Sequence, residues 1–381
     1  MNVLLATPYD FSATGGVTVV VQTIGERLMR AGHRAVFLVP QYGGTLKREE
    51  VDGIPLYRVP MREPVVAAHP LRSRAAFLLH LPATLRALAK ILREERIEVV
   101  NVHYFDRVWL YFFLLRRRLQ FAFVVSVHGS DVLGKLGAQN VEYLERRVDS
   151  IDRVVYCSDG FRRQVTSESS PLWMKSVPIL NGIDTSGLPE AKAPSADYIT
   201  SVAHLREHKG QDTLLRAFAM IKDDFPHLGL RIVGEGPFRP ELERVAKELG
   251  LGQRVELSGD VPREKALEII GGARVFCLPS RREPFGLVVL EAMALGVPVV
   301  ATNVGGVPEI LRRNTDAWLV EADSPREMSA ALKDALTNLE KRREHVQSAK
   351  ERVKDYFSVD RFFSDYQRLY QEVAATASRK G

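Results

Sequence analysis

The chain has 381 residues, of which 45% are hydrophobic and 26% charged, a globular composition that excludes long disordered or collagen-like regions. Its length suggests two domains, each large enough to bury a core without disulfides or a structural metal. The formal net charge is +6, and residues 1–185 hold all of the excess, with 24 Lys and Arg against 18 Asp and Glu. A nucleic-acid-binding groove would need basic residues that alternate with aromatic ones, and the sequence contains no such series, which argues against nucleic acid as a partner. An acidic substrate or an anionic membrane surface remains open.

Short β-branched runs alternate with helical patterns in both halves, as in parallel sheets covered by helices on both faces. The first half contains predicted strands at 2–7, 34–40, 99–103, 123–128 and 153–157, and the second half at 198–203, 230–234, 255–258, 275–279 and 298–302. Apolar spacings of three and four predict helices over 85–92 and 214–221. The aromatic stripe in 362–375 also has helical spacing, so we expect it to be buried.

The pattern therefore predicts an α/β chain of two doubly wound domains. Gly and Pro without periodicity mark a linker within residues 181–196, and we place the domains at 1–185 and 186–360. Ligands of open α/β sheets bind at the carboxyl ends of the strands, so function is sought in the loops that follow them, in a cleft between the two domains.

Two cysteines, Cys157 and Cys277, lie far apart in apolar runs, and we expect buried thiols rather than a disulfide. The apolar start, Met1 to Ala6, is too short for the core of a signal peptide. The nearest approach to an uncharged apolar span, Val108 to Leu115, ends at Arg116. We therefore expect no spanning helix and a cytoplasmic location.

Two loops of the first half carry candidate binding groups. After the first strand, Gly15 and Gly16 open a helix, where bare backbone N–H groups and the helix dipole favour an anion, although a glycine pair also makes ordinary turns. After the fourth strand, His128 precedes a glycine and could exchange hydrogen bonds with substrate hydroxyls, or simply bond Asp131. His103 follows its strand in the same way, and we interpret it as structural.

The loops of the second half are richer in polar groups. Residues 204–210 contain His204, Arg206, His208 and Lys209, a density of positive charge that suits phosphate, although exposed loop charges look the same. Gly234 and Gly236 again offer bare backbone at a strand end. In residues 278–298 a buried strand precedes an acidic loop and a helix that we expect over 285–295. Glu283 then lies just before that helix and Glu291 about two turns inside it.

Together these loops resemble glycosyltransferase family 4, the retaining nucleotide-sugar transferases of the GT-B fold. The resemblance spans nearly the whole chain and rests on the order and spacing of its motifs, which are Gly15-Gly16-Val17, Val127-His128-Gly129, Asn181-Gly182-Ile183-Asp184, Lys209-Gly210, Gly234-Glu235-Gly236-Pro237, Glu283 through Glu291 and Val304-Gly305-Gly306-Val307-Pro308-Glu309.

The resemblance implies an acceptor-binding first domain, a second domain for the nucleotide-sugar, and a last helix, 361–381, that returns to the first domain. It implies that Glu283 holds hydroxyls of the donor sugar, that Glu291 holds the ribose, and that Lys209 and the amides of Phe285, Gly286 and Leu287 hold the diphosphate. Donor contacts are also implied for Gly16, His204, Gly234, Gly236 and Val261, an acceptor contact for Gly15, and contact with the sugar for His128. The family usually has Arg where this chain has His204, so a titratable group replaces a permanent charge near the leaving diphosphate.

The expected reaction is metal-independent glycosyl transfer with retention and without a cofactor, to a sugar, lipid or small-molecule acceptor. Two alternatives remain: a nucleotide-sugar epimerase or hydrolase on the same scaffold, and a nucleotide-sugar-binding module without turnover. Basic residues between Arg72 and Arg96 alternate with Phe77 and several leucines, which fits either a helix packed on the sheet or peripheral association with the inner face of a membrane. The sequence specifies neither the sugar nor the oligomeric state.

Overall fold

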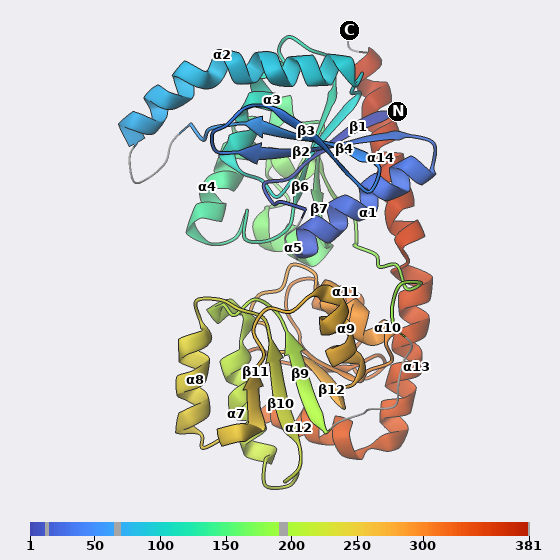
Figure 1. Cartoon of the computed structure of the whole chain (residues 1–381). Helices are drawn as coiled ribbons and strands as arrows, with labels where there is room; N and C mark the ends of the chain where they lie inside the picture. Colours follow the sequence, from blue (N-terminus) through green and yellow to red (C-terminus); the bar gives the residue numbers. More distant parts are fainter. Residues whose placement is uncertain (12–14, 65–69, 190–196, 380–381) are drawn as a thin grey trace. The chain divides into compact units, whose positions relative to one another are not determined.

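The computed structural model describes residues 1–11, 15–64, 70–189 and 197–379. The chain forms two compact units, of which unit 1 comprises Met1–Ile179 and Phe362–Gly381 and unit 2 comprises Leu180–Arg361 (Figure 1). Each unit contains a parallel sheet with helices, which confirms the predicted α/β class.

Unit 1 contains an eight-stranded sheet in the order β3-β4-β2-β1-β5-β6-β7-β8, in which only the pairing of β3 with β4 is antiparallel among the described strands. The strands are β1 (Asn2–Ala6), β2 (Arg34–Gln41), β3 (Lys47–Val51), β4 (Ile54–Pro60), β5 (Val99–His103), β6 (Ala122–Val127), β7 (Arg153–Tyr156) and β8 (Ser176–Pro178). In the register of the central strands, Val3 of β1 is aligned with Ala35 of β2 and Val99 of β5.

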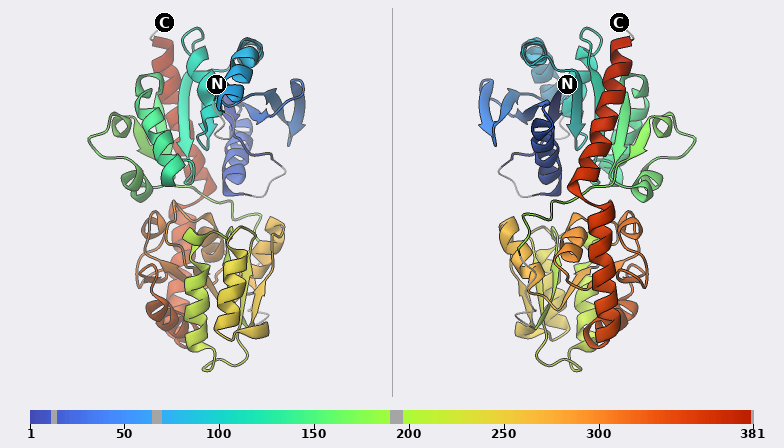
Figure 2. Two further views of the ribbon diagram at one scale, coloured as in Figure 1. Left: turned by 90° about the vertical axis from the view of Figure 1, so that its left-hand side faces the viewer. Right: turned by 90° about the vertical axis from the view of Figure 1, so that its right-hand side faces the viewer.

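The helices of unit 1 follow its strands. They are α1 (Gly16–Arg30), α2 (Pro70–Glu94), α3 (Leu110–Leu115), α4 (Gly134–Glu145), α5 (Asp159–Val165) and α6 (Pro171–Met174). The chain returns to unit 1 at Phe362, within α14 (Val359–Arg379), the red helix in front of the strands of that unit in the right-hand view of Figure 2. The predicted aromatic stripe is buried there, and the hydroxyl oxygen of Tyr370 accepts a hydrogen bond from Nδ2 of Asn101 at 2.8 Å.

Unit 2 contains a parallel six-stranded sheet in the order β11-β10-β9-β12-β13-β14. Its strands are β9 (Tyr198–Val202), β10 (Gly229–Val233), β11 (Val255–Leu257), β12 (Val275–Leu278), β13 (Val299–Thr302) and β14 (Trp318–Val320). Its helices are α7 (Gln211–Ile221), α8 (Arg239–Glu248), α9 (Arg263–Gly271), α10 (Leu287–Ala294), α11 (Val307–Ile310), α12 (Pro325–Thr337) and α13 (Leu339–Tyr356). Leu214, Leu215 and Phe218 of α7 are fully buried in its core, as their spacing predicts.

All ten predicted strands are present with ends that differ by at most one residue. Four further strands, β3, β4, β8 and β14, were not predicted. The helix expected at 285–295 is shorter and begins only at Leu287, because Gly286 takes a left-handed φ of 105° at the N-cap. The predicted state of the cysteines is confirmed, since Cys157 and Cys277 are buried and are not joined in a disulfide.

Candidate functional site

Most of the predicted donor-binding residues lie at one edge of the unit 2 sheet. They occupy the loops after β9, β10, β11 and β12 and the helix α10 that follows β12, and the carboxyl ends of parallel strands meet at the same edge. Backbone hydrogen bonds link these loops: the N–H of Arg281 donates to the carbonyl oxygen of His208 at 2.8 Å, and the N–H of Leu205 donates to that of Glu235 at 2.9 Å. The edge is therefore a connected layer of loops.

The central feature of this edge is the ion pair between Lys209 and Glu283. Lys209 ends the short 3-10 helix η3 (Glu207–Lys209), and its Nζ donates to Oε2 of Glu283 at 2.7 Å. The hydroxyl of Ser280 donates to the same Oε2 at 3.1 Å. The two charged side chains are 19% and 8% exposed. Among the described residues, Oε1 of Glu283 has no hydrogen-bond partner, so it can accept from a ligand while the remaining protons of Lys209 donate to one.

Two glycines explain how the backbone of this pair is held. A Cβ on Gly305 would lie 2.0 Å from the carbonyl oxygen of Glu283, and the N–H of Gly306 donates to that same oxygen at 3.0 Å. A Cβ on Gly210 would lie 2.1 Å from the carbonyl oxygen of Pro279. Both positions have positive φ, 54° at Gly305 and 67° at Gly210, which favours glycine independently. Close backbone approach therefore fixes the loops that carry Lys209 and Glu283.

Helix α10 begins directly after this loop. Gly286 is its N-cap and has no side chain to satisfy the N–H groups of the first turn, which is the local condition for binding an anion at a helix N-terminus. Of the three residues predicted to contribute amides here, Phe285 has its side chain buried at 3% exposure, with its ring 6.2 Å from that of Phe357. Only the backbone of Phe285 is therefore suited to contact a ligand, whereas Leu287 is partly exposed.

Glu291 lies inside α10 and pairs with an arginine that the sequence reasoning missed. Arg263, the first residue of α9, donates to Oε1 of Glu291 at 2.7 Å. The Glu291 side chain is 15% exposed, and burial raises its pKa against the opposing effect of Arg263. Val261, two residues before that arginine, is partly exposed. In the sequence, Arg263 looks like any exposed charge at a helix start, so no signal there distinguished it.

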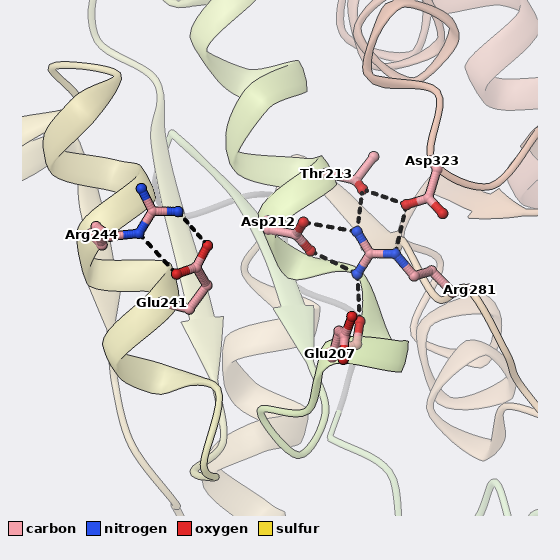
Figure 3. A network of polar contacts seen from close by, with 7 residues as sticks. All are labelled: Glu207, Asp212, Thr213, Glu241, Arg244, Arg281 and Asp323. Carbon is pink, nitrogen blue, oxygen red and sulfur yellow. Dashed lines mark hydrogen bonds and ion pairs between the residues drawn. The ribbon is translucent and has the colours of Figure 1, made fainter. Parts of the chain in front are cut away.

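A second missed residue, Arg281, ties the Glu283 loop to α7 (Figure 3). Its guanidinium donates to both carboxylate oxygens of Asp212, at 2.9 and 2.8 Å, and to Oδ1 of Asp323 at 2.6 Å. It also donates to the carbonyl oxygen of Glu207 at the start of η3. Arg244, on α8 in the same figure, has only exposed glutamate partners such as Glu241. The Arg281 network therefore connects the segment before Glu283 to the segment that carries Lys209.

The loop after β9 places the remaining predicted donor contacts. His204 is exposed, and its carbonyl oxygen accepts from the N–H of Arg206 at 3.0 Å. A Cβ on Gly234 would lie 2.1 Å from the carbonyl oxygen of Ala203, and one on Gly236 would lie 2.2 Å from that of Leu205. The physical reason for glycine at both positions is thus contact with the His204 loop. Next to Lys209, burial and then the charges of Lys209 and Arg282 lower the pKa of His208 to about 4.

In unit 1, the glycine pair lies at the predicted helix start. Gly15 is the N-cap of α1 with an extended φ of −170°, and Gly16 is the first helical residue and is exposed. Among the described residues, no atom would lie within 4 Å of a Cβ on Gly15, so neither crowding by them nor a left-handed conformation requires glycine there. No side-chain hydrogen bond from the N-cap satisfies the N–H groups of this helix N-terminus, which is the local condition for binding an anion.

His128 follows β6 as predicted and belongs to a polar cluster. Its Nε2 lies 3.2 Å from Nδ1 of the fully buried His103, and its backbone N–H donates to Oδ1 of Asp131 at 3.0 Å. The burial of His103 agrees with its structural interpretation, and Asp131 bonds the backbone N–H of His128 rather than its ring. Burial lowers the pKa of His128 to about 4, and burial and then His128 lower that of His103 well below its usual value. The ring of His128 is therefore neutral near pH 7 and can donate or accept a hydrogen bond.

Two family models match successive parts of the chain. Residues 14–186 match the model described as Glycosyltransferase Family 4, and residues 189–352 match the model described as Glycosyl transferases group 1. The chain belongs to glycosyltransferase family 4. It is a glycosyltransferase, and its two parallel-sheet units are those of the GT-B fold.

Relatives of this family 4 glycosyltransferase cover most of its length. It is 28% identical to a phosphatidylinositol N-acetylglucosaminyltransferase component of Arabidopsis thaliana, over 89% of this chain and 75% of that protein. It is 27% identical to a GDP-mannose-dependent phosphatidylinositol monomannoside mannosyltransferase of Mycolicibacterium smegmatis, over 85% and 86%. Among solved structures, a sucrose-phosphate synthase of Thermosynechococcus elongatus has a TM-score of 0.80 at 21% identity, covering 99% of this chain and 100% of its own.

A further solved structure is described as a complex. Anabaena HepE with UDP and glucose has a TM-score of 0.76 at 16% identity, covering 97% of this chain and 99% of its own. At such identities these likenesses show the GT-B fold alone. The ligand roles of the residues described above stay predictions for this transferase. Among the described residues there is no group of three or more His, Cys, Asp or Glu side chains arranged to hold a metal ion.

Proposed function

We propose that this glycosyltransferase moves a sugar from a nucleoside-diphosphate sugar to an acceptor with retention of anomeric configuration and without a metal. The observation that carries the proposal is the Lys209–Glu283 pair, 2.7 Å from Nζ to Oε2, beside the uncapped start of α10. A cation and free N–H groups suit a diphosphate, and a carboxylate with one free oxygen suits sugar hydroxyls. HepE, a GT-B neighbour, is described in complex with UDP and glucose, which supports a donor of this class.

In the proposed step, the bond between the anomeric carbon and the diphosphate oxygen breaks, and its electron pair leaves with the diphosphate. The acceptor hydroxyl oxygen bonds to the anomeric carbon from the same side, and its proton passes to the leaving phosphate. Lys209 and the α10 amides stabilise the negative charge that grows on the diphosphate. Lys209 is held in position before the reaction, because Glu283 orients its ammonium group. Gly305 in turn fixes the backbone of Glu283. No cofactor takes part.

Two histidines were also predicted to contact the donor, His204 in unit 2 and His128 in unit 1. His204 stands where the family usually has arginine, and it is exposed at the end of a loop that Gly234 and Gly236 hold. His204 carries no permanent charge, so we propose that Arg206 and Lys209 supply the permanent positive charge that neutralises the diphosphate. In unit 1, the neutral ring of His128 can donate or accept one hydrogen bond, as contact with a sugar hydroxyl requires. Two buried cysteines that are not joined in a disulfide fit a reducing compartment, and we place the reaction in the cytoplasm.

The donor is tested first by thermal unfolding with a panel of nucleoside diphosphates and nucleotide-sugars. A ligand at 100 times its dissociation constant adds about 2.7 kcal/mol to the unfolding free energy. We expect one base to raise the melting midpoint, with and without EDTA. Incubation of that donor with sugar and lipid acceptors, followed by NMR of the product, then gives the anomeric configuration. An inverted product, sugar release that depends on water alone, or a requirement for added metal would overturn the corresponding part of the proposal.

A further inference from the structure

Helix α2 of unit 1 has an apolar face that is turned to solvent along its first half. Leu71, Leu78 and Leu79 are 80%, 64% and 78% exposed. Together with the exposed Ala75 and Pro82 they recur at the three- and four-residue spacings of one helix face. Figure 1 shows this end of α2 reaching past the strands of its unit. In a helix that packs on a core, the apolar face is the buried one. The apolar face of the first half of α2 is exposed instead, so packing within unit 1 does not account for it.

The second half of α2 attaches the helix firmly to unit 1. Leu88 and Ile91 are each 1% exposed, and the hydroxyl of Thr84 donates to the carbonyl oxygen of Pro60 at 2.9 Å. In the first half only Phe77 is buried, with its ring 5.4 Å from that of Tyr111. The helix is therefore attached to the domain through its second half and Phe77, while most of its first half faces solvent.

By length and composition alone, α2 is the one helix of the described chain that could cross a membrane. The segment Leu71–Glu94 contains an 18-residue window with a mean hydropathy of 1.4, of which 28% is buried. This corrects the sequence expectation that Val108 to Leu115 comes nearest to a span. Crossing a bilayer would expose the core beneath Leu88 and Ile91, whereas lying along its surface would cost no contact within the unit. The structure thus favours an interfacial position.

The charges of α2 indicate what kind of surface lies against it. Residues 64–93 contain no Asp or Glu. Arg72 and Arg74 flank the exposed leucines, and Arg86, Lys90 and Arg93 continue the exposed side of the helix toward its end. All of the net positive charge of the chain lies in residues 1–185. Leucines flanked by exposed arginines complement anionic lipid headgroups above acyl chains.

We propose that α2 docks unit 1 onto an anionic lipid bilayer, with Leu71, Leu78 and Leu79 inserted at the boundary between headgroups and acyl chains. The arginines of α2 contact lipid phosphates. The enzyme thereby works at a membrane surface, where an acceptor with a lipid anchor is concentrated. The docking surface itself is independent of the donor chemistry proposed above, so the two can fail separately.

The test is cosedimentation of the full chain with vesicles of phosphatidylcholine alone and with an equimolar mixture of phosphatidylcholine and phosphatidylglycerol. We expect binding to the mixed vesicles that weakens at high salt. The double variant L78S/L79S should weaken it about a hundredfold, because each partly inserted leucine contributes about tenfold. Arg72→Gln and Arg74→Gln should each weaken it about fivefold.

The matched control is Leu136→Ser on α4, where the leucine is 66% exposed, close to the 64% of Leu78. It should leave vesicle binding unchanged. Circular dichroism and the donor-induced thermal shift should be the same in all variants, since the replaced side chains are exposed. Equal binding to both vesicle types, no binding at low salt, or equal losses in Leu136→Ser would overturn the proposal. So would a dimer that L78S/L79S dissociates without any vesicle binding, because the face would then belong to a second copy.

Discussion

Replacing Glu283 tests the proposed site most directly. Glu283→Gln keeps the shape of the side chain but removes the charge that Lys209 contacts at 2.7 Å. A carboxylate hydrogen bond to a sugar hydroxyl contributes about 1.5–3 kcal/mol. If the variant loses two of these, kcat/KM falls by roughly 10²–10⁴, since about 1.4 kcal/mol is a factor of ten. Glu283→Ala, which also removes the acceptor of Ser280, should abolish transfer.

The fold should survive this change. Removing one partner of a fully buried pair costs about 3–5 kcal/mol, but Lys209 is 19% exposed and water can reach it, so we expect a loss of about 2 kcal/mol. Initial rates with a saturating acceptor give kcat/KM, and denaturant unfolding gives the stability. The control is Glu256→Gln, which breaks a 2.8 Å ion pair with Arg231 at a side chain that is 53% exposed. The control should retain both activity and fold.

A binding measurement separates the two roles within the pair. Lys209→Met should weaken the nucleoside diphosphate and the nucleotide-sugar alike, because Lys209 is assigned to the diphosphate. Glu283→Gln should weaken only the nucleotide-sugar, because the carboxylate is assigned to the sugar. Calorimetry with both ligands measures this difference. Activity of Glu283→Gln within about threefold of the unchanged enzyme, or equal losses of both ligands, would refute the assignment.

Three further predictions concern the supports of the site. Gly305→Ala should reduce activity strongly, since its Cβ would lie 2.0 Å from the carbonyl oxygen of Glu283, whereas Gly252→Ala, with a similar φ of 52° and no described atom within 4 Å, should lower only the melting midpoint. Arg281→Met should destabilise unit 2 by about 2–4 kcal/mol in denaturant unfolding. Arg244 has only exposed partners, so Arg244→Met should leave the unfolding midpoint unchanged. The pKa of His128 is lowered to about 4 in the folded chain, so between pH 6.5 and 4 the unfolded chain binds a proton that the folded chain does not. The free energy of unfolding should therefore fall as pH drops through this range, and His128→Gln should make it depend less on pH.

The sheets were predictable because a strand covered on both faces consists almost entirely of apolar residues, as β6 and β12 do. The hairpin of β3 and β4 was missed because β3, Lys47–Val51, is charged and exposed. A local signal was nevertheless present, since Asp52 and Gly53 both have positive φ, 51° and 79°, as a two-residue Asp-Gly hairpin turn requires. β14 has only three residues, too few for a period to emerge.

The site was predictable where function requires a residue type at a fixed place relative to a strand or helix. Glu283 and Lys209 were found in this way. Their contact could not be found, because it joins positions 74 residues apart through the approach of two loops. Arg281 and Arg263 were missed for the same reason. A surface arginine that bonds three neighbouring segments and one that bonds only water have identical sequence surroundings, and only the packed loops distinguish them.

The glycines at the edge of the unit 2 sheet connect the sequence pattern with the packing of the loops. Gly234 and Gly236 were predicted from the sequence as bare backbone for a ligand. In the structure their missing Cβ atoms make room for the carbonyl oxygens of Ala203 and Leu205, on either side of His204. Gly305 makes room for Glu283 in the same way. The glycine pattern of this edge therefore encodes how closely the loops approach, and the position of each charged group follows from that approach. A side chain at Gly234 or Gly236 would displace the backbone beside His204, and one at Gly305 would displace the backbone of Glu283.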